Sequence, residues 1–116
     1  MNTNFFSIRV YGLWINDNHE IMLTDEYFQD KFLTKFPGGG LEFGEGIHEC
    51  LKREWLEELN IEIDIIEHFY TTDFFQVSVF NPNAQIVSIY YLVKPLSVPD
   101  VKISNKVFDF DELKNG

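Results

Sequence analysis

Residues 38–61 read GGGLEFGEGIHECLKREWLEELNI, and this stretch decides the fold. It begins with three glycines and holds five of the seven glycines in the chain. From Ile47 to Leu59 the apolar residues recur with the period of an α-helix. Asn60 follows at a position where a helix commonly ends, because asparagine tolerates the left-handed backbone conformation. The stretch therefore predicts a glycine-rich loop followed by one strong helix.

Three glutamates of this helix continue its apolar stripe instead of lying opposite to it. On an α-helix, residues seven apart differ by roughly 20° in azimuth. The stripe is formed by Ile47, Cys50, Leu51, Trp55 and Leu59. Glu54, Glu57 and Glu58 lie over its first three members, so all three carboxylates are expected to face the protein body.

Three inward carboxylates repel one another, and the one adjacent arginine, Arg53, cannot neutralise all of them. A hard divalent cation bound by carboxylate oxygens can do so, and Mg²⁺ suits such a ligand set. The spacing therefore predicts a metal site on this face of the helix. The alternative is a solvated or salt-bridged face, which is what most charge runs are.

The three glycines directly upstream support this prediction. Glycine permits positive φ and lets backbone carbonyls and amides approach a metal or a phosphate closely. Three glycines alone would indicate an ordinary turn. Their position directly before the acidic helix makes the combination informative.

The segments on both sides of the helix are rich in β-branched and aromatic residues, which is typical of strands. Before the helix, we expect strands at 5–15 and 19–24, a turn at 16–18 and an irregular loop over 25–34. After it, we expect strands at 61–70, 73–80, 85–93 and 107–110, and a helix or turn from 111 to 113. One helix among strands predicts an α+β fold with a mainly antiparallel or mixed sheet.

Length and composition limit the class of protein. The 116 residues fit one domain, 1–116, and the 45% hydrophobic content excludes disorder. A single cysteine excludes an internal disulfide framework, and no Cys/His cluster indicates zinc. The sequence shows no signal peptide and no membrane span, so we expect a cytoplasmic protein.

The net charge of −10 excludes a general nucleic-acid binder, which needs a basic face to offset phosphate charge. An acidic protein still binds phosphorylated molecules when divalent cations lie between the two negative partners. The expected partners are therefore small phosphorylated molecules.

The glycine loop and the acidic helix together resemble the Nudix box, G-x5-E-x7-R-E-U-x-E-E-x-G-U, in which U is a bulky apolar residue. Residues 39–61 match it from Gly39 through Glu45 and Arg53 to Ile61, except that Asn60 stands where the family has glycine. The flanking segments follow the usual Nudix order. The resemblance implies a Nudix fold, an α/β/α sandwich with a mixed sheet, whose C-terminal helix is missing or short here.

Nudix hydrolases cleave a diphosphate linked to another moiety by Mg²⁺- or Mn²⁺-assisted attack of water on phosphorus. The resemblance implies that Glu54, Glu57 and Glu58 bind the metal and that one of them doubles as general base. It also implies that Gly38 offers its backbone carbonyl to the metal. Arg53, counted among the catalytic residues, would orient Glu54 or hold Glu45. Together with Gly39, Arg53 and Glu45 form the structural part of the box.

Several residues outside the acidic triplet are further candidates for the site. Arg9, Lys35 and Gly39 are candidate substrate contacts, with ordinary surface charge as the alternative for the two cations. Many Nudix members have an additional acidic ligand outside the box. The candidates for it in this chain are Asp73, Asp100 and Glu112. We expect Phe74 and Phe75 to pack in the core rather than to stack on a base. Cys50 is expected to be buried and inert. The three histidines, His19, His48 and His68, are expected to have surface or packing roles.

The expected substrate is a nucleoside triphosphate or related nucleotide, acted on by a monomer or homodimer. ADP-ribose hydrolases often have a proline beyond the box where this chain has Val77. An ADP-ribose or nucleotide-sugar pyrophosphatase remains an alternative. A second alternative is a nucleotide-sensing Nudix domain without turnover, although such domains usually lose box carboxylates. An acidic structural or partner-binding domain does not explain three inward carboxylates.

Overall fold

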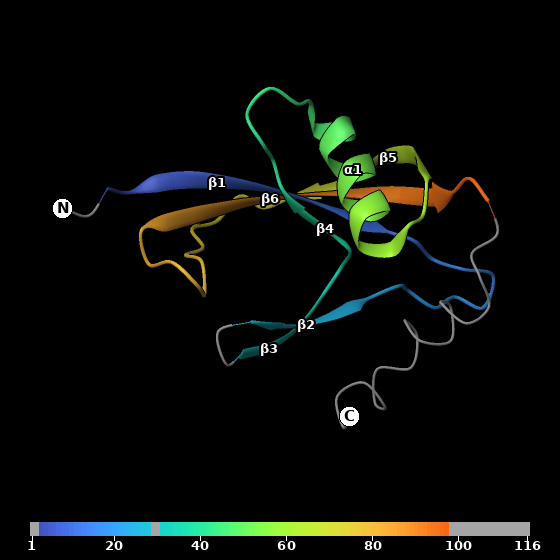
Figure 1. Ribbon diagram of the computed structural model, residues 1–116, viewed down its shortest axis with the longest axis horizontal. Coiled ribbons are helices and arrows are strands. Elements are labelled where there is room, and N and C mark those ends of the chain that lie inside the picture. Colours follow the sequence, from blue (N-terminus) through green and yellow to red (C-terminus); the bar gives the residue numbers. More distant parts are fainter. Residues whose placement is uncertain (1–2, 29–30, 98–116) are drawn as a thin grey trace.

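A mixed four-stranded sheet forms the centre of the protein (Figure 1). The computed structural model describes residues 3–28 and 31–97. The sheet has the order β4-β1-β6-β5, with bounds β1 Phe5–Leu13, β4 Gly38–Gly40, β5 Ile63–Thr71 and β6 Ala84–Pro95. β1 and β6 are parallel, while β4 and β5 pair antiparallel with their neighbours. The elements expected at 107–113 and the acids Asp100 and Glu112 lie outside the described residues.

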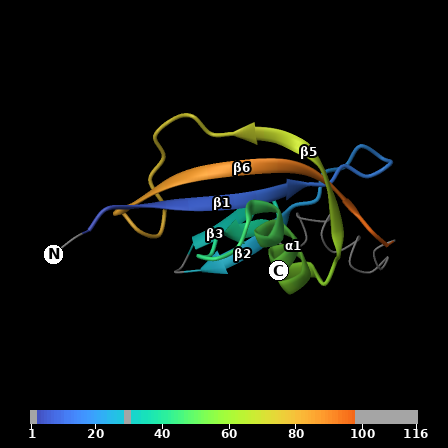
Figure 2. The same cartoon turned by 90° about the horizontal axis from the view of Figure 1, so that it is seen from above.

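Helix α1, Ile47–Leu59, packs against one face of this sheet. Figure 2, seen from above, shows β1 and β6 running side by side with α1 beside β1. The helix begins after Gly46, whose N–H donates a 2.8 Å hydrogen bond to the Glu49 carboxylate. It ends at Asn60, which has φ 55° and ψ 38°, so the left-handed stop is confirmed. Among the described residues no helix is long and apolar enough to span a membrane.

Trp55 anchors α1 to the sheet. Its ring is fully buried, and its Nε1–H donates a 3.1 Å hydrogen bond to the carbonyl of Pro37, directly before β4. A Cβ at Gly12 of β1 would lie 2.7 Å from Trp55 Nε1, so only glycine lets the helix approach this closely. Cys50 and Leu51 are also fully buried, whereas the two outer members of the predicted stripe, Ile47 and Leu59, are partly buried.

The prediction for residues 19–34 is wrong. A second, two-stranded sheet forms where a loop was expected, from β2, Thr24–Phe28, and β3, Lys31–Lys35. In the sequence, the apolar pairs Tyr27-Phe28 and Phe32-Leu33 are separated by three polar residues, a spacing that is compatible with such a hairpin. The expected strand at 19–24 is reduced to an isolated bridge between Ile15 and Ile21. Instead, the side-chain oxygen of Asn16 accepts hydrogen bonds from the backbone N–H groups of Asn18 and Glu20 in the turn.

The expected strand at 73–80 is also wrong. This segment makes one isolated bridge, between Val77 and Gln85, and otherwise consists of bends and irregular structure. Phe74 and Phe75 are 56% and 73% exposed, so the core packing predicted for them is wrong as well. Pairing with β6 is limited to the backbone hydrogen bonds Ser78 N–H to Ala84 and Ile86 N–H to Gln76, and at Phe80 the N–H donates to the Ser78 hydroxyl instead of to a neighbouring strand.

The buried Cys50 thiol is expected to resist alkylation in the folded protein. Burial raises its pKa to about 11, with the nearby Glu45 carboxylate as the next cause. At about pH 8 the reactive thiolate is therefore roughly 10²-fold scarcer than in an unfolded chain. Mass spectrometry should show alkylation by iodoacetamide that is slower in native protein by at least this factor. Equal rates in native buffer and in denaturant would contradict the burial of Cys50.

Candidate metal and phosphate site

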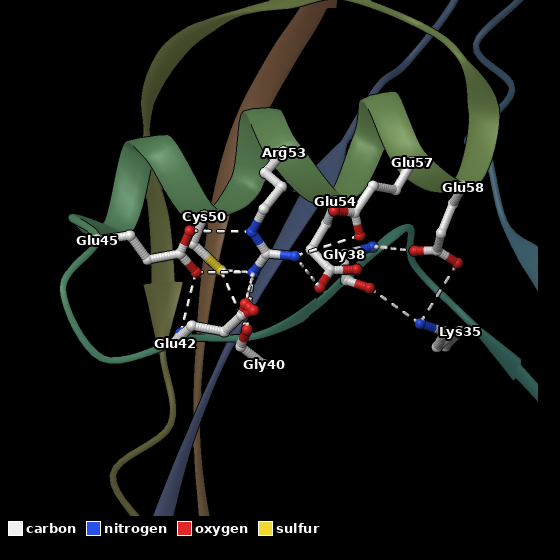
Figure 3. A network of polar contacts seen from close by, with 10 residues as sticks. All are labelled: Lys35, Gly38, Gly40, Glu42, Glu45, Cys50, Arg53, Glu54, Glu57 and Glu58. Carbon is white, nitrogen blue, oxygen red and sulfur yellow. Dashed lines mark hydrogen bonds and ion pairs between the residues drawn. The ribbon is translucent and has the colours of Figure 1, made fainter.

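Arg53 is the centre of the polar network beside α1 (Figure 3). Its Nε and Nη2 donate to the two carboxylate oxygens of Glu45 at 2.9 and 2.7 Å. Nη2 also donates to the Gly40 carbonyl at 3.2 Å. Nη1 donates to Glu54 at 3.0 Å and to Glu57 at 3.3 Å. The Arg53 guanidinium thus connects Glu45, at the loop–helix junction, to Glu54 and Glu57, which are two of the three predicted metal ligands.

The Arg53 hydrogen bond and, next to it, the backbone N–H of Glu42, which donates at 2.9 Å, together lower the pKa of Glu45 to about 2. The same Glu45 contact raises the pKa of Arg53 above its usual value. Glu42 adds a longer ion pair to Arg53, at 3.8 Å, which the sequence did not indicate. Glu45 therefore stays ionised wherever the protein is folded at ordinary pH.

This depressed pKa predicts a pH-dependent contribution to stability. The folded state favours ionised Glu45, so its contribution is fully present above about pH 4.5 and is lost as the pH falls toward about 2. Urea unfolding of wild type and Glu45→Gln should therefore differ most near neutrality and converge in acid. The exposed Glu62→Gln serves as control. A wild-type to Glu45→Gln difference that stays constant down to about pH 2 would contradict the assigned ion pair.

The three glutamates differ in exposure. The Glu54 side chain is 17% exposed and lies against β4, whereas the Glu57 side chain is 60% exposed. The prediction that all three carboxylates face the protein body is therefore wrong for Glu57. Arg53, one turn earlier, pairs with Glu57 at the helix surface. This is the i,i+4 arrangement that stabilises an exposed ion pair.

Glu58 points along the helix toward the end of β3 and the start of β4. Its Oε1 accepts a 3.2 Å hydrogen bond from the backbone N–H of Gly38. Its Oε2 lies 3.7 Å from Nζ of Lys35. The same ammonium donates a 3.0 Å hydrogen bond to the carbonyl of Gly38. Two cations therefore compensate the carboxylates, Arg53 and Lys35, and the sequence reasoning missed Lys35 in this role.

The donor set has the chemistry of a site for a hard cation. Within 3–28 and 31–97, no three His, Cys, Asp or Glu side chains are grouped closely enough to hold a metal ion. The Gly38 carbonyl and the Glu58 carboxylate nevertheless hold a cation already, the Lys35 ammonium. Oxygen donors of these two kinds suit Mg²⁺. The donor types therefore fit Mg²⁺, although the described acids are not gathered around a common point.

Glycine is required at positions 38 and 39. Gly38 has φ +154°, and a Cβ there would lie 2.0 Å from the carbonyl oxygen of Val10. A Cβ at Gly39 would lie 2.4 Å from the carboxyl carbon of Glu54. Contrary to the expected loop, these residues form β4, in which Gly39 pairs with Val10 of β1. Glycine is required at 38 by its positive φ and the close approach of the Val10 backbone, and at 39 by the close approach of the Glu54 carboxylate.

Gly39→Ala is expected to displace the Glu54 carboxylate while leaving the fold intact, because the obstructed atoms are the flexible end of a side chain. A shift of about 1 Å at a catalytic group costs on the order of 10²-fold in rate. Gly40→Ala is the matched control, since its Cβ would meet only Nη1 of Arg9, at 3.4 Å. Metal-dependent hydrolysis and thermal unfolding are measured for both. Equal activity in the two variants would contradict the assigned position of Glu54.

Arg9 and Lys35 meet over one aromatic ring. The guanidinium carbon of Arg9 lies 5.9 Å from the ring centroid of Tyr11, and the Lys35 ammonium lies 6.0 Å from it. Arg9 Nε also donates to the Tyr11 hydroxyl at 3.0 Å. Tyr11 stacks in turn on Tyr90 of the adjacent strand, at 5.4 Å. Sequence reasoning missed Tyr11, whose signal was its place two residues after Arg9, on the same face of β1.

The remaining candidates lie apart from this network or play packing roles. Asp73 is exposed on the bent segment after β5. His19 is exposed in its turn. His48 and His68 are exposed, and each sets a ring edge against Tyr91, at 5.1 and 5.6 Å. The surface and packing roles predicted for the histidines are confirmed.

A family model described as NUDIX domain matches residues 6–115. The chain belongs to the Nudix family. The predicted Nudix fold, an α+β arrangement with a mixed sheet and one helix in the described part of the chain, is confirmed. As a Nudix hydrolase it belongs to a group of enzymes that cleave pyrophosphate linkages.

Solved structures share this fold. A NUDIX hydrolase from Nitrosomonas europaea superposes with a TM-score of 0.70 at 18% identity, covering 96% of this chain and 77% of that one. A MutT NUDIX hydrolase from Burkholderia pseudomallei gives 0.68 at 18% identity, covering 84% and 74%. An ADP-ribose pyrophosphatase from Streptococcus suis gives 0.58 at 16% identity, covering 80% and 63%. No curated protein matches the sequence.

Proposed function

We propose that this Nudix hydrolase cleaves the diphosphate linkage of a nucleoside triphosphate or another nucleoside diphosphate derivative. The metal, Mg²⁺ with Mn²⁺ as the alternative, would be held by Glu54, Glu57 and Glu58 and by the carbonyl of Gly38. One observation carries this proposal: Gly38 and Glu58 already share a cation, at 3.0 and 3.7 Å from its nitrogen. Glu54 and Glu57 lie on the same side of α1, joined through Arg53.

The reaction is a displacement at phosphorus by water. A new P–O bond forms to the water oxygen, and the bridging P–O bond breaks, so that the leaving phosphate takes the electron pair. One of the three carboxylates accepts the proton of the attacking water. A bound divalent metal would lower the pKa of this water and neutralise charge on the phosphates. Arg53 would hold Glu54 and Glu57 in place during the reaction.

Arg9 and Lys35 are proposed to contact the diphosphate. Both cations lie on the Tyr11 ring, and Lys35 also reaches the Gly38–Glu58 pair. An otherwise acidic chain, with a net charge of −10, thus places two positive charges beside its acidic helix. Positive charge next to a metal site is what binding of a polyphosphate requires.

Turnover is favoured over simple nucleotide sensing because all three box glutamates are present. The substrate is tested by a panel of nucleoside triphosphates, oxidised purine triphosphates, ADP-ribose, dinucleoside polyphosphates and nucleotide sugars. ADP-ribose is included because one structural neighbour is described as an ADP-ribose pyrophosphatase. Release of phosphate or pyrophosphate is measured with Mg²⁺ and after its removal by a chelator.

We expect metal-dependent turnover of one substrate class, with the nucleoside triphosphates first. Metal-dependent turnover of ADP-ribose or a nucleotide sugar alone would replace the proposed substrate but keep the reaction. Binding of nucleotide without turnover of any panel member would support the sensing alternative. Turnover that persists unchanged in the chelator would contradict the metal-dependent reaction.

A further inference from the structure

Lys35 occupies the position from which a metal would contact Gly38 and Glu58. Its ammonium donates to the Gly38 carbonyl at 3.0 Å and lies 3.7 Å from Oε2 of Glu58 (Figure 3). The Lys35 side chain is only 18% exposed, so this is a held position and not a chance surface contact. Glu58 is fixed at the same place through its other oxygen, by the N–H of Gly38 at 3.2 Å.

A divalent metal and this ammonium cannot use the same oxygens together. Both are cations, and two like charges within a few ångströms repel strongly in a partly buried setting. Metal binding at Gly38 and Glu58 therefore has to move Lys35 first.

We infer that Lys35 is an internal placeholder cation, which holds the Gly38 carbonyl and Glu58 in position without metal and is displaced when a divalent metal binds. The inference rests on the proposed metal site and goes beyond it, because it makes metal affinity depend on a residue that is not a ligand. Lys35 acts here as a positioning residue that lowers the apparent metal affinity.

The displaced Lys35 side chain can remain beside the Tyr11 ring. Its ammonium already lies 6.0 Å from the centroid of the Tyr11 ring, whose face favours a cation. Arg9 lies over the same ring at 5.9 Å. Displacement toward Tyr11 would therefore bring two cations together, an arrangement that is favourable only when a polyphosphate is bound between them. Metal and substrate binding would then support each other.

Direct metal binding without substrate tests the placeholder role. Mn²⁺ binding, followed by electron paramagnetic resonance of the free ion, is compared for wild type, Lys35→Met and Lys52→Met. Lys52→Met is the matched control because it removes the same charge from the exposed side of α1. We expect Lys35→Met to bind Mn²⁺ about 3- to 30-fold more tightly than wild type, and Lys52→Met to differ by less. Lys35→Arg, which keeps the charge, should stay near wild type.

Weaker or unchanged binding in Lys35→Met, or an equal gain in Lys52→Met, would overturn the inference. Glu58→Gln separates this failure from failure of the proposed function. If Glu58→Gln weakens Mn²⁺ binding while Lys35→Met has no effect, the metal site stands and the placeholder role falls. If neither variant changes binding, both fall.

A measurement on the wild-type protein tests the same inference without relying on the correct folding of a variant. NMR of the lysine side-chain Cε–Hε groups, with the Lys35 signal assigned by its absence in Lys35→Arg, follows this residue during a Mg²⁺ titration. The inference predicts that the Lys35 signal shifts more than every other lysine signal. A Lys35 signal that stays fixed while Mg²⁺ binds would overturn it.

Discussion

Replacing Glu58 with glutamine is expected to lower metal-dependent hydrolysis by about 10²-fold or more, because the substitution removes an anionic oxygen from the proposed metal site. The fold should persist. The glutamine side chain keeps an oxygen that can accept the Gly38 N–H, and loss of the partly exposed Glu58–Lys35 ion pair should lower the free energy of unfolding only modestly. Initial rates are measured at saturating metal, together with the thermal unfolding midpoint.

Glu62→Gln is the matched control, since it removes one exposed carboxylate just beyond the helix. Its rate should stay within about twofold of wild type. Glu57→Gln should resemble Glu58→Gln, although Glu57 is the more exposed of the two. A Glu58→Gln enzyme with wild-type activity would show that the assigned metal site is wrong.

The largest effect on stability is expected for Trp55→Ala. The side chain is fully buried, and removing a buried tryptophan costs about 3–5 kcal/mol through the lost contacts and the cavity that remains. The substitution also removes one of the two donors to the Pro37 carbonyl, the Trp55 Nε1–H at 3.1 Å, and leaves the Gly12 N–H at 2.9 Å. We therefore expect a lower free energy of unfolding and a shift of the melting midpoint of about 10–20 °C.

Leu56→Ala on the opposite side of the helix is the control, because Leu56 is 46% exposed. It should cost well under 1 kcal/mol apart from its small effect on helix propensity. Unfolding in urea, followed by far-ultraviolet circular dichroism, compares the two variants. A similar loss in the free energy of unfolding for both variants would mean that Trp55 does not anchor α1 to the sheet.

The helix and its stop could be predicted from the sequence because the determinants are local. The 3.6-residue period fixes the buried Cys50, Leu51 and Trp55, and Asn60 takes the left-handed conformation that the pattern requires. Glu54 also lies inward, as its azimuth indicates. Glu57 does not, because Arg53 competes for it at the surface, and a helical projection does not include such side-chain pairing.

Features that depend on partners distant in the sequence could not be predicted in this way. The polar residues between Phe28 and Phe32 made the β2–β3 pair look like a loop. The 73–80 segment has the composition of a strand but pairs only briefly with the start of β6, through the Val77–Gln85 bridge and two backbone hydrogen bonds. The role of Lys35 depends on Gly38 and Glu58 converging from two elements. Its contact with Glu58, 23 positions further along the chain, leaves no periodic signal in the sequence.

The location of the proposed metal site is tested most directly by paramagnetic broadening of backbone amide signals with trace Mn²⁺. We expect the amides of Gly38, Gly39, Glu54 and Glu58 to broaden first. The amides of β5, which carries the exposed acids Asp64 and Glu67 on the far edge of the sheet, should stay sharp. Strongest broadening on β5, or uniform broadening over all exposed acidic residues, would contradict a metal site at the glycine strand and the acidic helix.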